Sequence, residues 1–69
     1  MQTETLRKVE SYLRAKFANQ KIGLKPSTSD PDMAEVYIGD EFVGTLYRDE
    51  DAGEVSYDFN MSIIDIDLA

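Results

Sequence analysis

Residues 54–63 read Glu-Val-Ser-Tyr-Asp-Phe-Asn-Met-Ser-Ile, a strict alternation of polar and apolar residues. Side chains of a β-strand point alternately to its two faces, so this pattern predicts a strand with one buried and one exposed face. Similar but shorter runs lie at residues 34–38 and 42–47, and a further run at residues 21–25 ends before Pro26. Because proline cannot donate a hydrogen bond to a neighbouring strand, it marks the end of that run. The sequence therefore predicts four strands.

Two predicted loops determine how these strands pair. A first loop at residues 39–41 gives the pairs Ile38–Phe42, Val36–Gly44 and Ala34–Leu46. A second loop at residues 49–52, followed by Gly53, gives the pairs Leu46–Val55, Gly44–Tyr57 and Phe42–Phe59. A slip of one residue would turn every apolar side chain to the other face, so the agreement of both loops on one apolar face supports this register.

A helix is predicted before the strands, over residues 3–18. Its apolar residues recur at intervals of three and four and form one stripe: Leu6, Val9, Tyr12, Leu13 and Phe17. Thr3 is the expected N-cap and Asn19 the expected left-handed residue at the C-terminal end. Two i,i+4 ion pairs are expected along the helix, Glu4–Lys8 and Glu10–Arg14. We therefore expect one small α+β domain over residues 1–69, with an N-terminal helix packed on one face of a mostly antiparallel sheet of about four strands.

The alternation breaks at residues 63–64, where two isoleucines adjoin. Beyond this point the apolar positions are Ile64, Ile66 and Leu68, and aspartates stand between them. A β-bulge or a bend into a separate short strand would produce this change of phase, so the alternatives for residues 64–68 are a strand, a bulge or a tail. A terminal apolar strand can pair with another chain, so this segment is one candidate contact.

The composition excludes several kinds of chemistry. The 69 residues include no cysteine and no histidine, so the chain lacks a disulfide, a thiol nucleophile, an imidazole base and an imidazole metal ligand. A core this small leaves little room for an enclosed active site, because ligand pockets occupy about 300–1,000 Å³. No apolar run approaches the roughly 20 residues that span a bilayer. We therefore expect a cytoplasmic protein that is not an enzyme and has no cofactor, metal site or membrane segment.

Charge is distributed unevenly along the chain, whose formal net charge is -7. Residues 1–25 carry six bases and two acids, a net charge of +4, whereas residues 26–69 carry one base and twelve acids, a net charge of -11. The basic cluster would attract a nucleic acid, but most of the predicted sheet lies in the acidic half, which repels phosphates. We therefore expect a protein partner, either a second copy or another protein, and no nucleic acid.

Acidic runs suggest an alternative function, in which a small accessory protein binds a divalent cation or small ligand. Residues 49–53 begin like a calcium loop, but the glycine is at the fifth rather than the sixth position, and Asn60 stands where the loop requires a bidentate glutamate. The runs at residues 30–32 and 65–67 have no glycine turn after them. Solvated surface residues account for these runs more simply, so this function ranks second.

One predicted helix leaves one face of the predicted sheet open. We expect this open face to display tyrosines and a valine beside polar residues, a composition typical of interfaces. With the terminal segment included, the candidate partner surface is Tyr37, Val43, Tyr47, Ile64, Ile66 and Leu68. The leading hypothesis is a non-enzymatic protein-interaction module that self-associates through the open face or the terminal strand.

Two stretches carry a resemblance to a known family: Tyr12-Leu13-Arg14, and residues 34–68, which begin Ala-Glu-Val-Tyr-Ile-Gly-Asp-Glu-Phe-Val-Gly-Thr-Leu-Tyr-Arg-Asp-Glu-Asp and finish Asp-Ile-Asp-Leu. They resemble an uncharacterised family of short, acidic alphaproteobacterial proteins that is classed as a domain of unknown function. The resemblance covers nearly the whole chain and implies a small stand-alone bacterial domain in the cytoplasm. It implies no activity and no catalytic residues.

Overall fold

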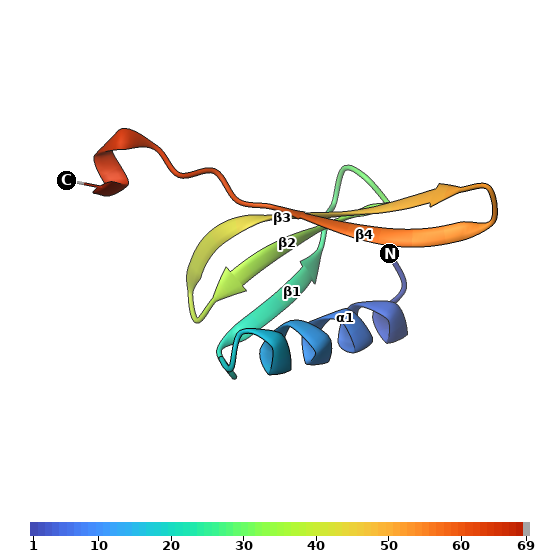
Figure 1. The fold of residues 1–69 in the computed structure, drawn as a ribbon, viewed down its shortest axis with the longest axis horizontal. Helices are drawn as coiled ribbons and strands as arrows, with labels where there is room; N and C mark the ends of the chain where they lie inside the picture. Colours follow the sequence, from blue (N-terminus) through green and yellow to red (C-terminus); the bar gives the residue numbers. More distant parts are fainter. Residues whose placement is uncertain (69) are drawn as a thin grey trace.

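A computed structural model describes residues 1–68 of the chain. Its elements are, in order, α1 (Thr3–Lys16), β1 (Ile22–Pro26), β2 (Met33–Ile38), β3 (Glu41–Asp51), β4 (Glu54–Asn60) and the short 3₁₀ helix η1 (Asp65–Leu68). The strands form one antiparallel sheet in the order β1-β2-β3-β4, so neighbours in the sheet are neighbours in the sequence. The predicted α+β fold, a helix followed by four strands, is confirmed (Figure 1).

The helix α1 ends two residues earlier than predicted. Gln2, rather than Thr3, is its N-cap, and the Gln2 side chain makes no capping hydrogen bond. At the other end, the amide of Asn19 donates to the carbonyl of Arg14 at 2.9 Å, and the left-handed residue is Ala18, with a φ of 52°. This arrangement is a Schellman motif, in which glycine is the usual left-handed residue. The predicted left-handed position is therefore wrong by one residue.

The first hairpin confirms part of the predicted register. A two-residue turn, Gly39-Asp40, replaces the predicted three-residue loop. Of these two residues only the glycine has a positive φ, 62°, as in a type II′ turn. Farther from the turn, two predicted pairs are observed, Val36–Gly44 and Ala34–Leu46.

The turn is one residue shorter than predicted, and the additional strand residue forms a β-bulge in β3. Tyr37 pairs with Phe42 and Ile38 with Glu41, so the predicted Ile38–Phe42 pair is wrong. Val43 is the extra residue of the bulge, and its side chain packs against the core. Phe42 instead meets the ring of Tyr37 on the far face of the sheet. The bulge has therefore exchanged the faces that were predicted for these two neighbours.

The second hairpin differs more from the prediction. Its turn is Ala52-Gly53, and both residues have a positive φ, 53° and 81°. A type I′ turn requires this, and its usual sequence is Asn-Gly. The predicted loop at residues 49–52 is therefore wrong, and Leu46 pairs with Phe59 instead of Val55. Because the error is four residues, an even number, the apolar side chains of β4 still face the predicted side of the sheet.

Gly44 lies where the end of β4 leaves no room for a side chain. A Cβ atom at this position would overlap the carbonyl oxygen of Asn60 and would stand 2.8 Å from the Cε1 atom of the Phe59 ring. Phe59, rather than the predicted Tyr57, therefore covers this glycine. The predicted aromatic pair between Phe42 and Phe59 does not form, because the two rings are on opposite faces.

The core lies between α1 and the first three strands. Its buried apolar residues are Leu6, Leu13, Ile22, Leu24, Ala34, Val36 and Leu46. The helix packs on β1, at one edge of the sheet, and β4 forms the other edge (Figure 1). Val55 and Tyr57 of β4 face the same side as the core but are 40% and 37% exposed. The prediction that the helix covers the apolar face therefore holds for only part of the sheet.

The last described residues extend away from the body of the molecule. β4 ends three residues before the predicted strand does, and Asp65–Leu68 form η1. The amide of Asp67 donates to the carbonyl of Ile64 at 2.9 Å, and the amide of Ile64 donates to the Asp67 carboxylate at 3.3 Å. Of the three alternatives, a strand, a bulge or a tail, the segment is a tail that carries one short 3₁₀ helix. It projects beyond the end of β4 (Figure 1), and the molecule measures 43 × 23 × 22 Å.

Candidate protein-interaction groove

Helix side chains close the β1 edge of the sheet. Glu10 is 6% exposed, and its Oε2 atom accepts the N–H of Leu24 at 2.9 Å. Arg14 Nε donates to the carbonyl of Ile22 at 2.7 Å, and Arg7 donates to the carbonyl of Leu24 at 3.0 Å. Both arginines also form ion pairs with Glu10, Arg7 at 3.1 Å and Arg14 at 3.6 Å. The backbone groups that an edge strand would offer to another chain are therefore occupied along β1.

An open groove runs between the helix and β4 at the opposite edge of the sheet. Its helix wall includes Val9, Tyr12, Leu13 and the C-cap residue Phe17, and its sheet wall includes Val55, Tyr57, Phe59 and Met61. Val43, one of the predicted partner-surface residues, also lines the smaller hollow. It contains two hollows of about 420 Å³ and 280 Å³, and Leu13 and Phe59 line both. No described carboxylate lines either hollow, whereas Lys8 stands at the rim of the larger one. We call this feature the α1–β4 groove.

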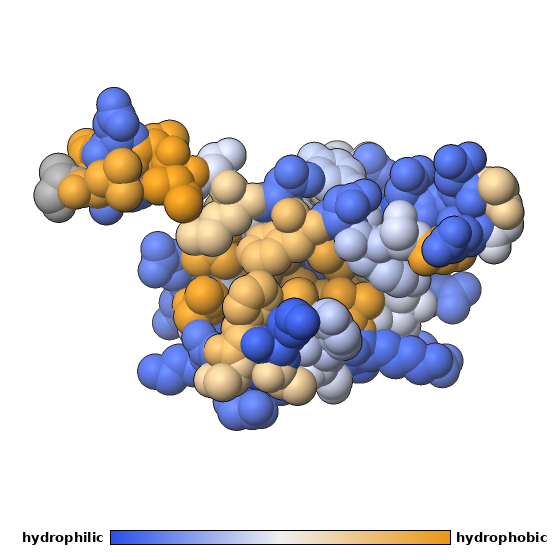
Figure 2. Space-filling model, viewed as in Figure 1, coloured by the Kyte–Doolittle hydropathy of each residue, from blue (hydrophilic) through white to orange (hydrophobic). Residues whose placement is uncertain are grey.

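The groove is the main apolar surface on its side of the molecule. Figure 2 shows hydrophobic side chains gathered in the middle of this face, with a second hydrophobic group on the projecting terminal segment. In the helix wall, Tyr12 is 62% exposed and Phe17 is 56% exposed. Monomeric proteins rarely expose contiguous apolar patches larger than a few hundred Å², and larger patches mark interaction sites. The α1–β4 groove is therefore the strongest candidate for a binding surface.

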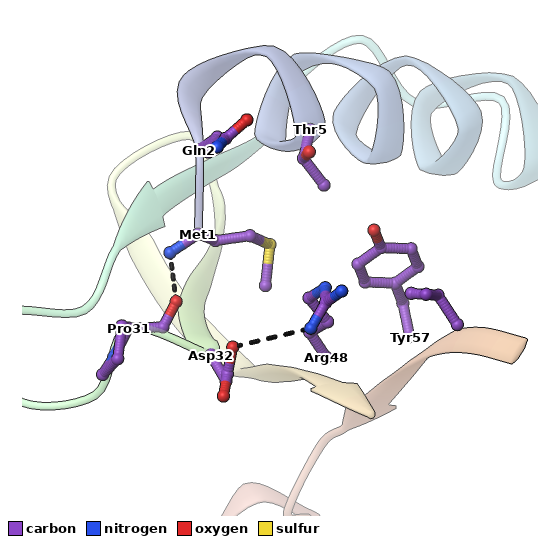
Figure 3. Close-up of a pocket in the computed structure, with 8 residues that line it drawn as sticks. Met1, Gln2, Thr5, Pro31, Asp32, Arg48 and Tyr57 are labelled. Atoms are coloured by element: carbon purple, nitrogen blue, oxygen red, sulfur yellow. Dashed lines mark hydrogen bonds and ion pairs between the residues drawn. The ribbon is translucent and has the colours of Figure 1, made fainter. Parts of the chain in front are cut away.

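A more polar cleft continues the groove past the beginning of the helix. This cleft, of about 480 Å³, is lined by Met1, Gln2, Thr5, Pro31, Asp32, Arg48, Val55 and Tyr57. Arg48 pairs with Asp32 at 3.9 Å, and the amino group of Met1 donates to the carbonyl of Pro31. In Figure 3 the ring of Tyr57 stands beside the Arg48 side chain, below α1. Tyr57 lines both the cleft and the groove, so it is central to this face.

The far face of the sheet carries an aromatic cluster in a polar setting. The Tyr37 hydroxyl donates to Glu35 Oε1 at 3.0 Å, and Lys25 Nζ lies 4.5 Å from the centre of the Tyr37 ring. Phe42 meets the same ring edge to face, with 5.7 Å between the ring centres. The hydrogen bond to Glu35, then desolvation and the negative charge of Glu35, raises the pKa of Tyr37. The hydroxyl and the ring of Tyr37 therefore already have partners within the same chain.

The predicted partner surface is divided among three places. Tyr37 and Tyr47 lie on the far face, as predicted, and Tyr47 is 40% exposed. The expected placement of Val43 on that face is wrong, because the β-bulge turns it toward the core. The other predicted residues lie on the projecting segment, between 57% and 76% exposed: Ile64, Ile66 and Leu68. No single surface therefore contains all six residues.

The groove is not predicted from the sequence, although the width of a helix gives a signal for it. A helix is about 10–12 Å across with its side chains, whereas strands lie about 4.8 Å apart, so one helix covers roughly two or three strands. Val55 and Tyr57 were assigned correctly to the apolar face of the sheet. They lie on β4, the strand farthest from β1, and α1 packs on β1, so the helix does not cover them.

The acidic runs do not converge on one site. Asp49, Glu50 and Asp51 belong to β3 rather than to the predicted loop, and successive side chains of a strand point to opposite faces. Asp32 is engaged by Arg48. Within residues 1–68, no group of three or more acidic, histidine or cysteine side chains is placed to hold a metal ion.

Comparison with known proteins identifies the family. Residues 5–67 match the family described as "Protein of unknown function (DUF3126)". The chain belongs to the DUF3126 family. This confirms the resemblance to a family of unknown function, which assigns no activity to the fold. No curated protein and no solved structure matches the chain. Across residues 1–68, no helix combines the length and the apolar character that a membrane crossing requires.

Proposed function

We propose that this DUF3126 protein is a non-enzymatic protein-interaction module whose α1–β4 groove binds an apolar segment of a protein partner. One observation carries the proposal: Val55 and Tyr57 point to the core side of the sheet, yet they remain 40% and 37% exposed. Removing apolar surface from water contributes about 25 cal/mol per Å². A partner that covers the part of this face that the helix leaves exposed would therefore gain binding free energy.

The composition of the groove favours a protein as its ligand. Tyrosine, phenylalanine and methionine are enriched at the centres of interfaces, where charged residues are depleted. The groove offers these residue types on both walls, with Lys8 at the rim. A basic rim favours an apolar segment that also carries acidic residues. The far face is the weaker candidate, because Tyr37 is already held by Glu35 and Lys25.

Site-specific photocrosslinking tests this proposal. A photoreactive phenylalanine analogue replaces Tyr57 in the groove, or Tyr47 on the far face as a control with nearly the same exposure, 37% against 40%. In cells that produce the chain, we expect a discrete protein adduct from the Tyr57 position and little or none from the Tyr47 position. No adduct from the Tyr57 position, or equal adducts from both, would contradict the proposal.

A further inference from the structure

We infer that the occupant of the α1–β4 groove is the terminal segment, residues 62–68, of a second copy of this chain, exchanged reciprocally between the two copies. The inference rests on the proposed function and names the partner. Four observations support it: the excess exposed area of the chain, the exposure of the terminal segment, its charge, and its length relative to β4.

The molecule exposes more area than a compact monomer of its size. Its accessible surface is 5250 Å² for a chain of 7.8 kDa. The usual scaling gives about 4,400 Å² for a compact monomer of that mass. The excess of about 850 Å² is close to the roughly 800 Å² that each partner buries in a standard interface. A second copy would therefore bring the exposed area per chain into the ordinary range.

The terminal segment is apolar and carries the charge that the groove favours. Its apolar side chains are all more than half exposed: Ile63, Ile64, Ile66 and Leu68. Its charged residues are Asp65 and Asp67, and it has no base. The helix that forms one wall of the groove carries Lys8 at the rim, where it pairs with Glu4 at 3.5 Å, and lies in the part of the chain with a net charge of +4. The other wall, β4, lies in the part with a net charge of -11, so apolar contact favours the pairing and the charge favours an orientation with the two aspartates toward the helix.

The length of the segment matches the length of the groove. The inference requires η1 to unwind on binding, and the seven residues 62–68, once extended, reach at most about 23–25 Å. The seven residues of β4 span about 24 Å. In an extended conformation Ile64, Ile66 and Leu68 project to one side, and the two aspartates project to the other. The segment can therefore run beside β4 with one apolar side in the groove.

A second copy accounts for the arrangement better than a segment folded back on its own chain. Met61 already lines one end of the groove, and from there the segment continues beyond β4, away from the helix (Figure 1). Entry into its own groove would need a chain reversal directly after Met61, whereas residues 61–64 form no turn and continue away from the helix (Figure 1). Reciprocal exchange between two copies gives two equivalent contacts and closes the assembly as a dimer.

Sedimentation equilibrium of the full chain, from low to high micromolar concentration, tests the inference. The terminal variant carries Ile66→Asp and Leu68→Asp, the groove variant carries Tyr57→Asp, and Tyr47→Asp is the matched control on the far face. We expect the unaltered chain and the Tyr47→Asp control to dimerise. The terminal variant and the groove variant should each have a dimer Kd that is about tenfold higher or more. A tenfold change in Kd corresponds to about 1.4 kcal/mol, and burial of one such apolar side chain contributes more than that. Circular dichroism verifies that each variant is folded.

Mixing the two variants gives a second readout. The terminal variant keeps an intact groove and the groove variant keeps an intact segment, so the mixture should form a heterodimer through one contact while each variant alone remains monomeric. A monomeric unaltered chain, or a mixture that does not associate, overturns the inference. If the terminal variant dimerises normally and the Tyr57→Asp variant does not, the inference is overturned, but the proposed function still stands. Loss of the dimer in the terminal variant alone shows that the segment binds outside the groove, which overturns the inference, and the crosslinking experiment at Tyr57 then decides the proposed function separately.

Discussion

The buried Glu10 gives a prediction whose size follows from the contacts on the β1 edge. Glu10→Ala removes the carboxylate that accepts the Leu24 amide, and a hydrogen bond to a charged group contributes about 1.5–3 kcal/mol. The ion pairs with Arg7 and Arg14 add less, about 1 kcal/mol together, because the arginine side chains are 54% and 36% exposed. The expected loss is therefore about 2.5–4 kcal/mol. Cores of this size supply about 3–5 kcal/mol, so the variant should be close to unfolding.

Urea unfolding followed by circular dichroism measures this loss, at one fixed protein concentration because association would shift the apparent stability. Glu4→Ala is the matched control: the Glu4–Lys8 pair has the same i,i+4 spacing but is exposed, so its loss should cost at most about 0.5 kcal/mol. Glu10→Gln keeps an acceptor for the Leu24 amide and should fall between the two. Equal losses for Glu10→Ala and Glu4→Ala would refute the reasoning.

Three further predictions concern other strained or coupled positions. Ala18→Gly should raise the free energy of unfolding by about 0.5–1 kcal/mol, because relief of the left-handed alanine outweighs the added chain entropy, whereas Ala15→Gly within the helix should lower it by about 1 kcal/mol; thermal melts measure both. Gly44→Ala should lower the free energy of unfolding by at least about 2 kcal/mol, since its Cβ would overlap the backbone of β4, and a stability like that of the unaltered chain in urea titration would contradict the described pairing. The raised pKa of Tyr37 means that its protonated phenol contributes stability that is present below the ordinary tyrosine pKa and is lost as pH rises through the folded value. Glu35→Gln should lower that pKa toward the ordinary value in an alkaline ultraviolet titration, and an unchanged titration would exclude Glu35 as the cause.

The architecture could be predicted because periodicity reports which face of an element is buried. The stripe that includes Leu6 and Leu13 indicated the helix, and strict alternation in residues 54–63 indicated the last strand. The second turn could not be predicted, because Ala52 adopts a left-handed conformation for which alanine gives no signal. The predicted side of the sheet for the apolar residues of β4 is nevertheless correct, because the register differs from the prediction by an even number of residues.

The surface was harder to predict than the fold because it depends on details that periodicity does not report. The β-bulge at Val43 adds one residue to one strand, and this exchanges the faces of Phe42 and Val43. The i,i+4 spacing of Glu10 and Arg14 was recognised, but the burial of Glu10 against the Leu24 amide depends on how the helix sits beside β1. That same position of the helix leaves β4 uncovered, so the groove follows from packing rather than from any motif.

An isotope-filtered NOESY experiment on an equal mixture of doubly labelled and unlabelled chains tests most directly whether one copy's terminal segment lies in another's groove. We predict intermolecular NOEs from the methyl groups of Ile66 and Leu68 to Val55 and Tyr57, and none to Tyr47 on the far face. NOEs to Val55 and Tyr57 that arise only within one chain, or no NOE between the segment and the groove at concentrations where the chain is dimeric, would contradict the account.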